Sequence, residues 1–103
     1  MISFFKQLFQ KSSEDPAEAI RKGAVIVDVR TKEEYAQGHL AGSKNIPLND
    51  IKLKAEMIRK WNKPVITVCR SGNRSGMAKS ILQIAGIEVY NGGAWHSLKA
   101  NKA

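Results

Sequence analysis

The clearest pattern along the chain is the alternation of short, continuous apolar runs with segments whose apolar residues recur at helical spacing. Residues 24–29 read Ala-Val-Ile-Val-Asp-Val, and residues 64–68 read Pro-Val-Ile-Thr-Val. Runs that are apolar throughout, rather than at alternate positions, are typical of parallel strands covered on both faces. The sequence therefore predicts an α/β fold, in which a mostly parallel central sheet is covered by helices on both faces.

Capping and stop signals place helices between these strands. Asp15 before Pro16 indicates a helix start, with Glu18 reaching back to the cap. Thr31 and Glu34 are spaced as a capping box, which opens a second helix. The predicted helices span residues 15–23, 31–38, 49–61 (Ile51, Ala55 and Ile58 on one face), 75–85, and from Ala94 onward. Two further short strands are predicted at residues 44–47 and 88–90.

The first residues of the chain form a separate segment. Their apolar residues fall at helical spacing: Ile2, Phe4, Phe5, Leu8 and Phe9. We expect residues 1–13 to be an amphipathic segment that lies against the domain or contacts a membrane or a partner, and residues 14–103 to be one domain. Because no run approaches the roughly 18 apolar residues that span a bilayer, we expect a cytoplasmic protein without a membrane span.

Composition narrows the function classes. The 103 residues include 17 basic and 9 acidic side chains, for a formal charge of +8. The lysines are scattered from Lys6 to Lys102 without a dense block or an aromatic-basic motif, so we expect attraction of small anions rather than nucleic-acid binding. The single cysteine excludes an internal disulfide and any two-cysteine metal site.

The candidate chemistry comes directly after the second apolar run. Cys69 ends this run, and residues 70–75 continue as Arg-Ser-Gly-Asn-Arg-Ser before a helical pattern begins. A helix start and neighbouring guanidinium groups stabilise a thiolate relative to a thiol. Gly72 allows the loop to curl, so that successive N–H groups point at one centre. The pattern indicates a nucleophilic cysteine inside an anion-binding loop, on an edge of the sheet where Asp28 also lies.

Several motifs resemble the signatures of the rhodanese family, in the family's order and at its spacings. They are Val27-Asp28-Val29-Arg30, Glu34-Tyr35, residues 38–43, Asn45-Ile46-Pro47 and residues 69–75. The resemblance implies a rhodanese-like three-layer domain and a sulfurtransferase without metal or organic cofactor. Its Cys69 would take sulfane sulfur from an anionic donor such as thiosulfate and pass it, as a persulfide, to cyanide, a thiol or an acceptor protein. The chain departs from the family in lacking a convincing first strand and in having Trp95 close to the paired glycines.

The length of the loop separates sulfur transfer from phosphate chemistry. Four residues lie between Cys69 and Arg74, whereas phosphatases that share the fold carry one residue more. The wider loop admits a tetrahedral oxyanion, and the shorter loop suits a single added sulfur atom. A phosphatase or an arsenate reductase is therefore the less favoured alternative. A non-catalytic persulfide carrier or sulfide-sensing module stays open, because it needs the same loop.

The loop residues have distinct expected roles. Arg70 is expected to guide the anionic donor, and Arg74 to hold the loop through its carbonyls or through Asp28. Ser75 is expected to start the helix and to donate to the sulfur. The anionic persulfide is expected to be stabilised by the backbone N–H groups of Arg70, Ser71, Gly72, Asn73 and Arg74.

Two further residues are expected to support the site rather than to react. Asp28 and Arg30 are predicted to form an ion pair near the sheet edge, with Glu34 or Arg74 as further partners. His39 lies in a turn and has no second histidine or acidic cluster near it in the sequence, so a structural role is expected. Trp95 is expected to pack in the core.

Overall fold

The computed structural model describes residues 15–98, so the predicted amphipathic segment 1–13 lies outside the described residues. Within that range, parallel strands form one four-stranded sheet in the order β2-β1-β3-β4. The strands are β1 (Val25–Asp28), β2 (Lys44–Asn45), β3 (Val65–Cys69) and β4 (Val89–Ala94). The helices are α2 (Pro16–Arg21), α3 (Lys32–Ala36), α4 (Leu48–Arg59), α5 (Asn73–Ile84) and the short 3₁₀ helix η1 (Trp95–Ser97).

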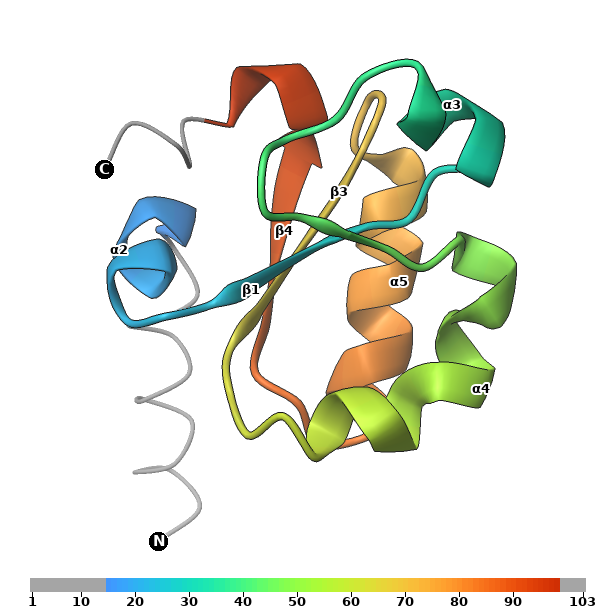
Figure 1. The fold of residues 1–103 in the computed structure, drawn as a ribbon. Helices are drawn as coiled ribbons and strands as arrows, with labels where there is room; N and C mark the ends of the chain where they lie inside the picture. The colour runs from blue at the N-terminus through green and yellow to red at the C-terminus, as the bar shows by residue number, and fades with distance from the viewer. Residues whose placement is uncertain (1–14, 99–103) are drawn as a thin grey trace, which may run out of the picture.

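The sheet separates two layers of helices, as the continuous apolar runs predicted. Figure 1 shows α2 and η1 on one side of the strands and α4 and α5 on the other. Ile51 and Ile58 of α4 and Leu82 of α5 are fully buried against one face of the sheet, and each such burial contributes roughly 1.5–3 kcal/mol. Ala19 and Tyr90 belong to the core on the other face. The predicted three-layer α/β architecture is confirmed.

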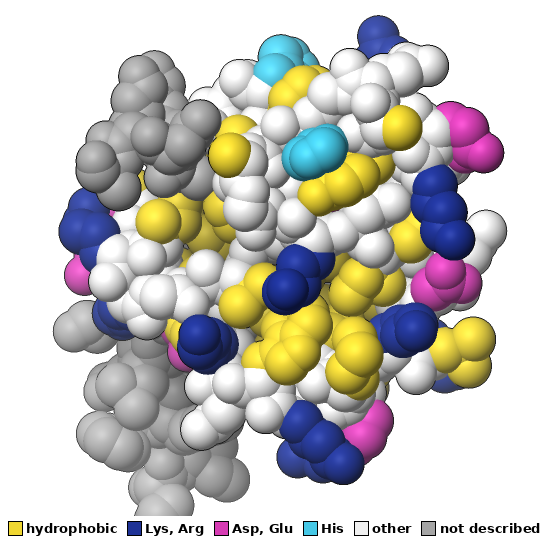
Figure 2. All heavy atoms as spheres, in the orientation of Figure 1, with side chains coloured by type: hydrophobic (Ala, Val, Ile, Leu, Met, Phe, Trp, Pro, Cys, Tyr) yellow, Lys and Arg dark blue, Asp and Glu magenta, His cyan; other side chains and the backbone are white. Residues whose placement is uncertain are grey.

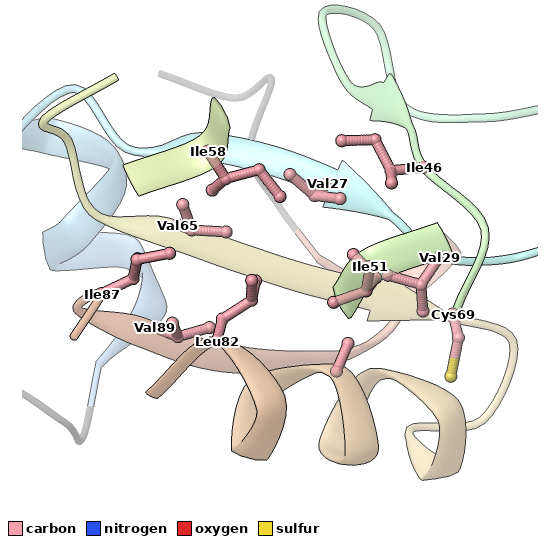
Figure 3. Close-up of a cluster of buried hydrophobic side chains, with 11 residues drawn as sticks. Val27, Val29, Ile46, Ile51, Ile58, Val65, Cys69, Leu82, Ile87 and Val89 are labelled. Atoms are coloured by element: carbon pink, nitrogen blue, oxygen red, sulfur yellow. The ribbon is translucent and has the colours of Figure 1, made fainter. Parts of the chain in front are cut away.

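Strand β3 illustrates why a buried parallel strand has no polar side. Val65 and Cys69 pack in the core beneath α4 and α5, whereas Ile66 and Val68 pack in the core beneath α2. Thr67 is also fully buried, and its hydroxyl donates to the carbonyl of Ser75 in α5, at 2.8 Å. Both faces of the strand are therefore occupied, and the strand ends with Cys69 at the edge of the core (Figure 3).

Most local start signals act as predicted. The Asp15 side chain caps α2 by accepting from the N–H of Ala17, at 3.0 Å. The Thr31–Glu34 capping box is complete at the start of α3. Within residues 15–98, the Glu18 carboxylate makes no hydrogen bond to the cap; it lies 3.8 Å from Arg21, one turn later in the same short helix.

Besides shifts of one or two residues at other ends, three differences from the sequence-based expectation affect the region around Cys69. Helix α5 begins at Asn73 rather than residue 75, because Gly72 adopts a left-handed conformation (φ 105°) and serves as its N-cap. Strand β4 continues to Ala94, because pairing with β3 extends past Tyr90. The predicted helix from Ala94 is wrong within the described residues: only the three-residue η1 forms, and Leu98 after it is extended.

Gly92 makes the longer β4 possible. The register between β3 and β4 shifts between Thr67 and Val68, which leaves Gly92 as an extra residue in β4. A Cβ atom at this position would lie 2.7 Å from Ile66 Cγ2 and 2.9 Å from Val68 Cγ1. Only glycine therefore lets the strand approach the core at this point.

No helix within residues 15–98 combines the length and the apolar character needed to cross a membrane. The charges are dispersed, as the scattered lysines predicted: Figure 2 shows Lys and Arg side chains distributed over the visible face, with acidic and apolar side chains between them.

Candidate functional site

The candidate site lies at the carboxyl ends of β1 and β3, the edge where parallel α/β sheets bind their ligands. Cys69 is the last residue of β3, and a tight loop leads from it into the first turn of α5 (Figure 1). Figure 3 shows the Cys69 side chain leaving the apolar cluster with its sulfur turned toward this loop. The strand therefore fixes the Cα of the cysteine, and the loop surrounds its sulfur.

Backbone N–H groups converge on the sulfur. The N–H of Gly72 donates to Cys69 Sγ at 3.0 Å, and the N–H of Ser75, in the first turn of α5, donates at 3.4 Å. Gly72 has a left-handed conformation (φ 105°), which lets the chain turn from the loop into α5 at this residue. The positive end of the α5 dipole acts on Cys69 Sγ. Backbone N–H groups converge on the sulfur as expected, but the hydrogen bonds to Sγ come from Gly72 and Ser75 rather than from all of residues 70–74. This arrangement suits an anionic sulfur.

The pKa of the Cys69 thiol is set by two opposing effects. Burial raises the pKa of Cys69 and is the largest single effect, since the residue is only 1% exposed. The hydrogen bond between Cys69 and the Ser75 hydroxyl, and those from the N–H groups of Ser75, Gly72 and Ser71, lower the pKa and together outweigh burial. The pKa of Cys69 therefore lies below its usual value of 9.0, so a larger fraction is thiolate at neutral pH.

Ser75 is more than a helix-start residue. Ser75 is fully buried, and its Oγ accepts a hydrogen bond from the thiol of Cys69, with Sγ and Oγ 3.4 Å apart. The same hydroxyl donates to Oδ1 of Asn91 in β4, at 2.6 Å. Sequence analysis did not identify Asn91 as a site residue, because its only local signal is its position directly before the paired glycines.

Asp28 and Arg30 form the expected ion pair beneath the loop. Asp28 is fully buried, and Arg30 is 5% exposed. Arg30 donates from Nε to Oδ1 at 2.9 Å and from Nη2 to Oδ2 at 2.8 Å, and its own N–H caps the same carboxylate at 3.0 Å. The guanidinium also donates to the carbonyls of Glu34 and Gly38. These bonds connect the end of β1 to the segment that follows it. They also compensate for the cost of burying the two charges.

Arg74 has a different partner from the expected ones. Instead of Asp28 or the loop carbonyls, its guanidinium binds the Glu34 carboxylate of α3, with Nη1–Oε1 at 2.7 Å and Nη2–Oε2 at 3.1 Å. The hydrogen bond from Arg74 is the largest cause that lowers the pKa of Glu34 to about 2, followed by the bond from the Thr31 N–H. Asp28 is unavailable to Arg74, because Arg30 already occupies both of its oxygens.

The remaining loop residues face solvent. Arg70, Ser71 and Asn73 are exposed. The structure places Arg30 and Arg74 in ion pairs, whereas Arg70 has no ion pair within residues 15–98. Arg70 is therefore the guanidinium of this loop that is available to an incoming anion.

His39 and Trp95 lie in the supporting structure. The His39 ring stacks on Tyr35 with centroids 3.7 Å apart, and its Nδ1 lies 2.7 Å from the Tyr35 carbonyl. Trp95 packs against the core beneath α2, with the Arg30 guanidinium carbon 4.6 Å from its ring centroid. Among residues 15–98, no cluster of three or more His, Cys, Asp or Glu side chains is arranged to hold a metal ion.

Comparisons with known proteins agree with this geometry. The family model described as Rhodanese-like domain matches residues 12–97. Thiosulfate sulfurtransferase GlpE of Pseudomonas fluorescens is 36% identical over 87 residues, which cover 81% of this chain and 77% of that protein. The uncharacterized protein YqhL of Bacillus subtilis is 34% identical over 87 residues, or 84% of this chain and 68% of that protein. A rhodanese structure from E. coli, solved with anions, is similar with a TM-score of 0.68 and 35% identity, covering 75% of this chain and 93% of that chain.

Proposed function

The chain belongs to the rhodanese-like family, and we propose that it is a sulfurtransferase that moves sulfane sulfur from thiosulfate, or a related anionic donor, to cyanide or a thiol through a persulfide on Cys69. One observation carries the proposal: the N–H groups of Gly72 and Ser75 both point at Cys69 Sγ, at 3.0 and 3.4 Å. Donors fixed in this way stabilise a thiolate and then a persulfide anion without having to reorganise.

In the first half-reaction, the thiolate of Cys69 attacks the outer sulfur of thiosulfate. A new S–S bond forms at Cys69, and the S–S bond of thiosulfate breaks, so that sulfite leaves with the electron pair. Arg70, exposed and without an ion pair among the described residues, attracts the anionic donor. The terminal sulfur then carries the negative charge beside the N–H groups of the loop.

In the second half-reaction, an external nucleophile attacks the terminal sulfur of the persulfide. The Cys69 S–S bond breaks, and the electron pair returns to Sγ. When cyanide is the acceptor, thiocyanate leaves; when a thiol is the acceptor, the persulfide of that thiol leaves. Since Cys69 is the only cysteine of the chain, no internal thiol can resolve the persulfide as a disulfide. The acceptor must come from outside, and because sulfite leaves before the acceptor reacts, the expected kinetics are ping-pong.

Steady-state assay with thiosulfate and cyanide tests the proposal. Catalytic thiocyanate formation with parallel double-reciprocal plots is the expected result. Transfer of one sulfur per protein without turnover would instead indicate a persulfide carrier or sulfide-sensing module. Absence of any sulfur on the protein after incubation with several sulfane donors would contradict both.

A further inference from the structure

Asn91 contacts both ends of the sulfur-binding loop from a neighbouring strand. Its Nδ2 donates to the carbonyl of Gly72 at 3.2 Å, and its Oδ1 accepts from the Ser75 hydroxyl at 2.6 Å. The same Oδ1 accepts from the N–H of Gly93 at 2.9 Å. Gly72 and Ser75 are the residues whose N–H groups donate to Cys69 Sγ. The Asn91 side chain therefore makes hydrogen bonds to both residues whose N–H groups donate to the sulfur.

The fold provides space for this side chain at several points. The register shift in β4 pairs Asn91 with Thr67 and Gly93 with Val68. Gly93 has a positive φ of 76°, which favours glycine, and its N–H donates to Asn91 Oδ1. A Cβ atom on Gly76 of α5 would lie 3.2 Å from Asn91 Nδ2. Glycine at this position thus admits the amide between β4 and the first turn of α5.

The Ser75 hydroxyl has one proton and two acceptors within reach. With a neutral thiol, Sγ–H donates to Ser75 Oγ at 3.4 Å, and the hydroxyl proton goes to Asn91 Oδ1 at 2.6 Å. When Cys69 loses its proton to solvent, the hydroxyl can rotate and donate to the anionic sulfur, a charge-assisted bond stronger than a neutral one. Asn91 Oδ1 then still accepts from the N–H of Gly93. Asn91 therefore competes with the sulfur anion for this proton while it anchors the Gly72 peptide.

We propose that Asn91 is a positioning residue for Cys69, which sets the proton affinity of the sulfur through the Ser75 hydroxyl and the Gly72 peptide. This inference rests on the proposed function, because sulfur transfer requires the thiolate and the persulfide anion at this atom. Within residues 15–98, Asn91 makes no hydrogen bond to Cys69 Sγ, and its effect passes through Ser75 and Gly72, which it binds.

The test is the pH dependence of Cys69 alkylation by iodoacetamide, which needs no sulfur donor. Asn91→Asp keeps the side-chain size and the acceptor for Ser75, removes the donor to Gly72, and adds a negative charge. The lost donor and the added negative charge both disfavour the thiolate, so the alkylation midpoint should rise by about one pH unit. The exposed Gln83→Glu of α5 is the control for net charge, and its midpoint should remain that of the parent.

The Ser75→Ala background separates transmission through the hydroxyl from the field of the new carboxylate. There, Asn91→Asp should raise the midpoint by less than half of its shift in the parent. A shift in the Ser75→Ala background of half or more of the parent's shift, or no shift in the parent, would overturn the inference. Thermal unfolding shows whether Asn91→Asp folds. If it does not fold, Asn91→Ala is used instead, and the Gly72 amide should then exchange its hydrogen faster than in the parent. Unchanged exchange of this amide would contradict the inference. A parent that shows a normal alkylation profile but no sulfur transfer would refute the proposed function alone.

Discussion

The carboxylate of Glu34 in α3 binds both terminal nitrogens of Arg74 in α5, across 40 positions of sequence. The two side chains are 31% and 33% exposed, so the pair is at the surface but partly shielded. It joins the first turns of two helices that flank the sulfur-binding loop. Thr31 donates to the same carboxylate, which makes Glu34 both a capping residue and an anchor for Arg74.

Glu34→Gln should weaken the fold in a pH-dependent way. The pKa of Glu34 is about 2, below its usual value of 4.5, so the ionised form is favoured by folding. Its contribution is complete above pH 4.5 and is lost as the pH falls through about 2. Because glutamine preserves the capping box and the ion pair is partly exposed, the loss at neutral pH should be below about 1 kcal/mol.

Chemical unfolding of the parent and Glu34→Gln between pH 2 and 7 measures this difference, which should shrink toward the acid end of the range. Glu33→Gln, at the neighbouring exposed position in the first turn of α3, is the matched control. A stability difference for Glu34→Gln that stays constant with pH would contradict the assignment of the ion pair.

Cys69→Ser should abolish sulfur transfer and leave the fold intact. The loop that stabilises a thiolate cannot ionise a serine hydroxyl near neutral pH, so turnover should fall by at least about a thousandfold. The substitution barely changes volume, and the new hydroxyl can still accept from the N–H of Gly72. Thiocyanate formation and the thermal unfolding midpoint are the measurements. Substantial residual turnover would show that the sulfur is carried elsewhere.

Arg70→Ala should raise the KM for thiosulfate by roughly three- to tenfold, with a smaller effect on kcat. The reason is electrostatic: Arg70 is exposed at the loop, while Arg30 and Arg74 are already paired. The difference between the variant and the parent should diminish as salt is added. Lys54→Ala, which removes one exposed positive charge from α4, is the control and should leave KM unchanged. Equal KM values for Arg70→Ala and the parent at low ionic strength would remove Arg70 from the site.

The unmodified protein should not hydrolyse aryl phosphates. The Gly72 N–H lies 3.0 Å from Cys69 Sγ, so the loop closes tightly around the sulfur. Insertion of one residue after Ser71 should displace this donor and weaken sulfur transfer, and it could widen the loop enough to admit phosphate or arsenate. Phosphate release from an aryl phosphate is the measurement. Efficient release by the parent would refute the argument from loop length.

Protein treated with a sulfur donor should carry one additional sulfur on Cys69 and remain a monomer. Intact mass and peptide mapping locate the gain, and size-exclusion chromatography reports the oligomeric state. A sulfinic acid adds nearly the same mass, but cyanide or a small thiol removes a persulfide and leaves a sulfinic acid unchanged. A mass gain that resists cyanide, or that maps to another residue, is incompatible with the persulfide.

The buried strands, most helix starts and the loop around Cys69 could be predicted from the sequence alone. Continuous apolar runs predicted buried parallel strands, and the loop after Cys69 predicted the convergence of N–H groups that the structure contains. The Thr31–Glu34 capping box at the start of α3 was also predicted from the sequence. These features depend on residues within a few positions of one another, whose geometry follows from the local backbone.

Only the tertiary structure decided which side chains meet around the loop. Arg74 was expected to bind the loop carbonyls or Asp28, yet Arg30 occupies both oxygens of Asp28 and Arg74 binds Glu34 instead. The role of Asn91 depends on the register shift beside Gly92, which no local propensity encodes. Such contacts depend on how α3, β4 and α5 pack at the carboxyl edge of the sheet, because hydrogen-bonding groups there compete for partners that are distant in sequence and adjacent only after folding.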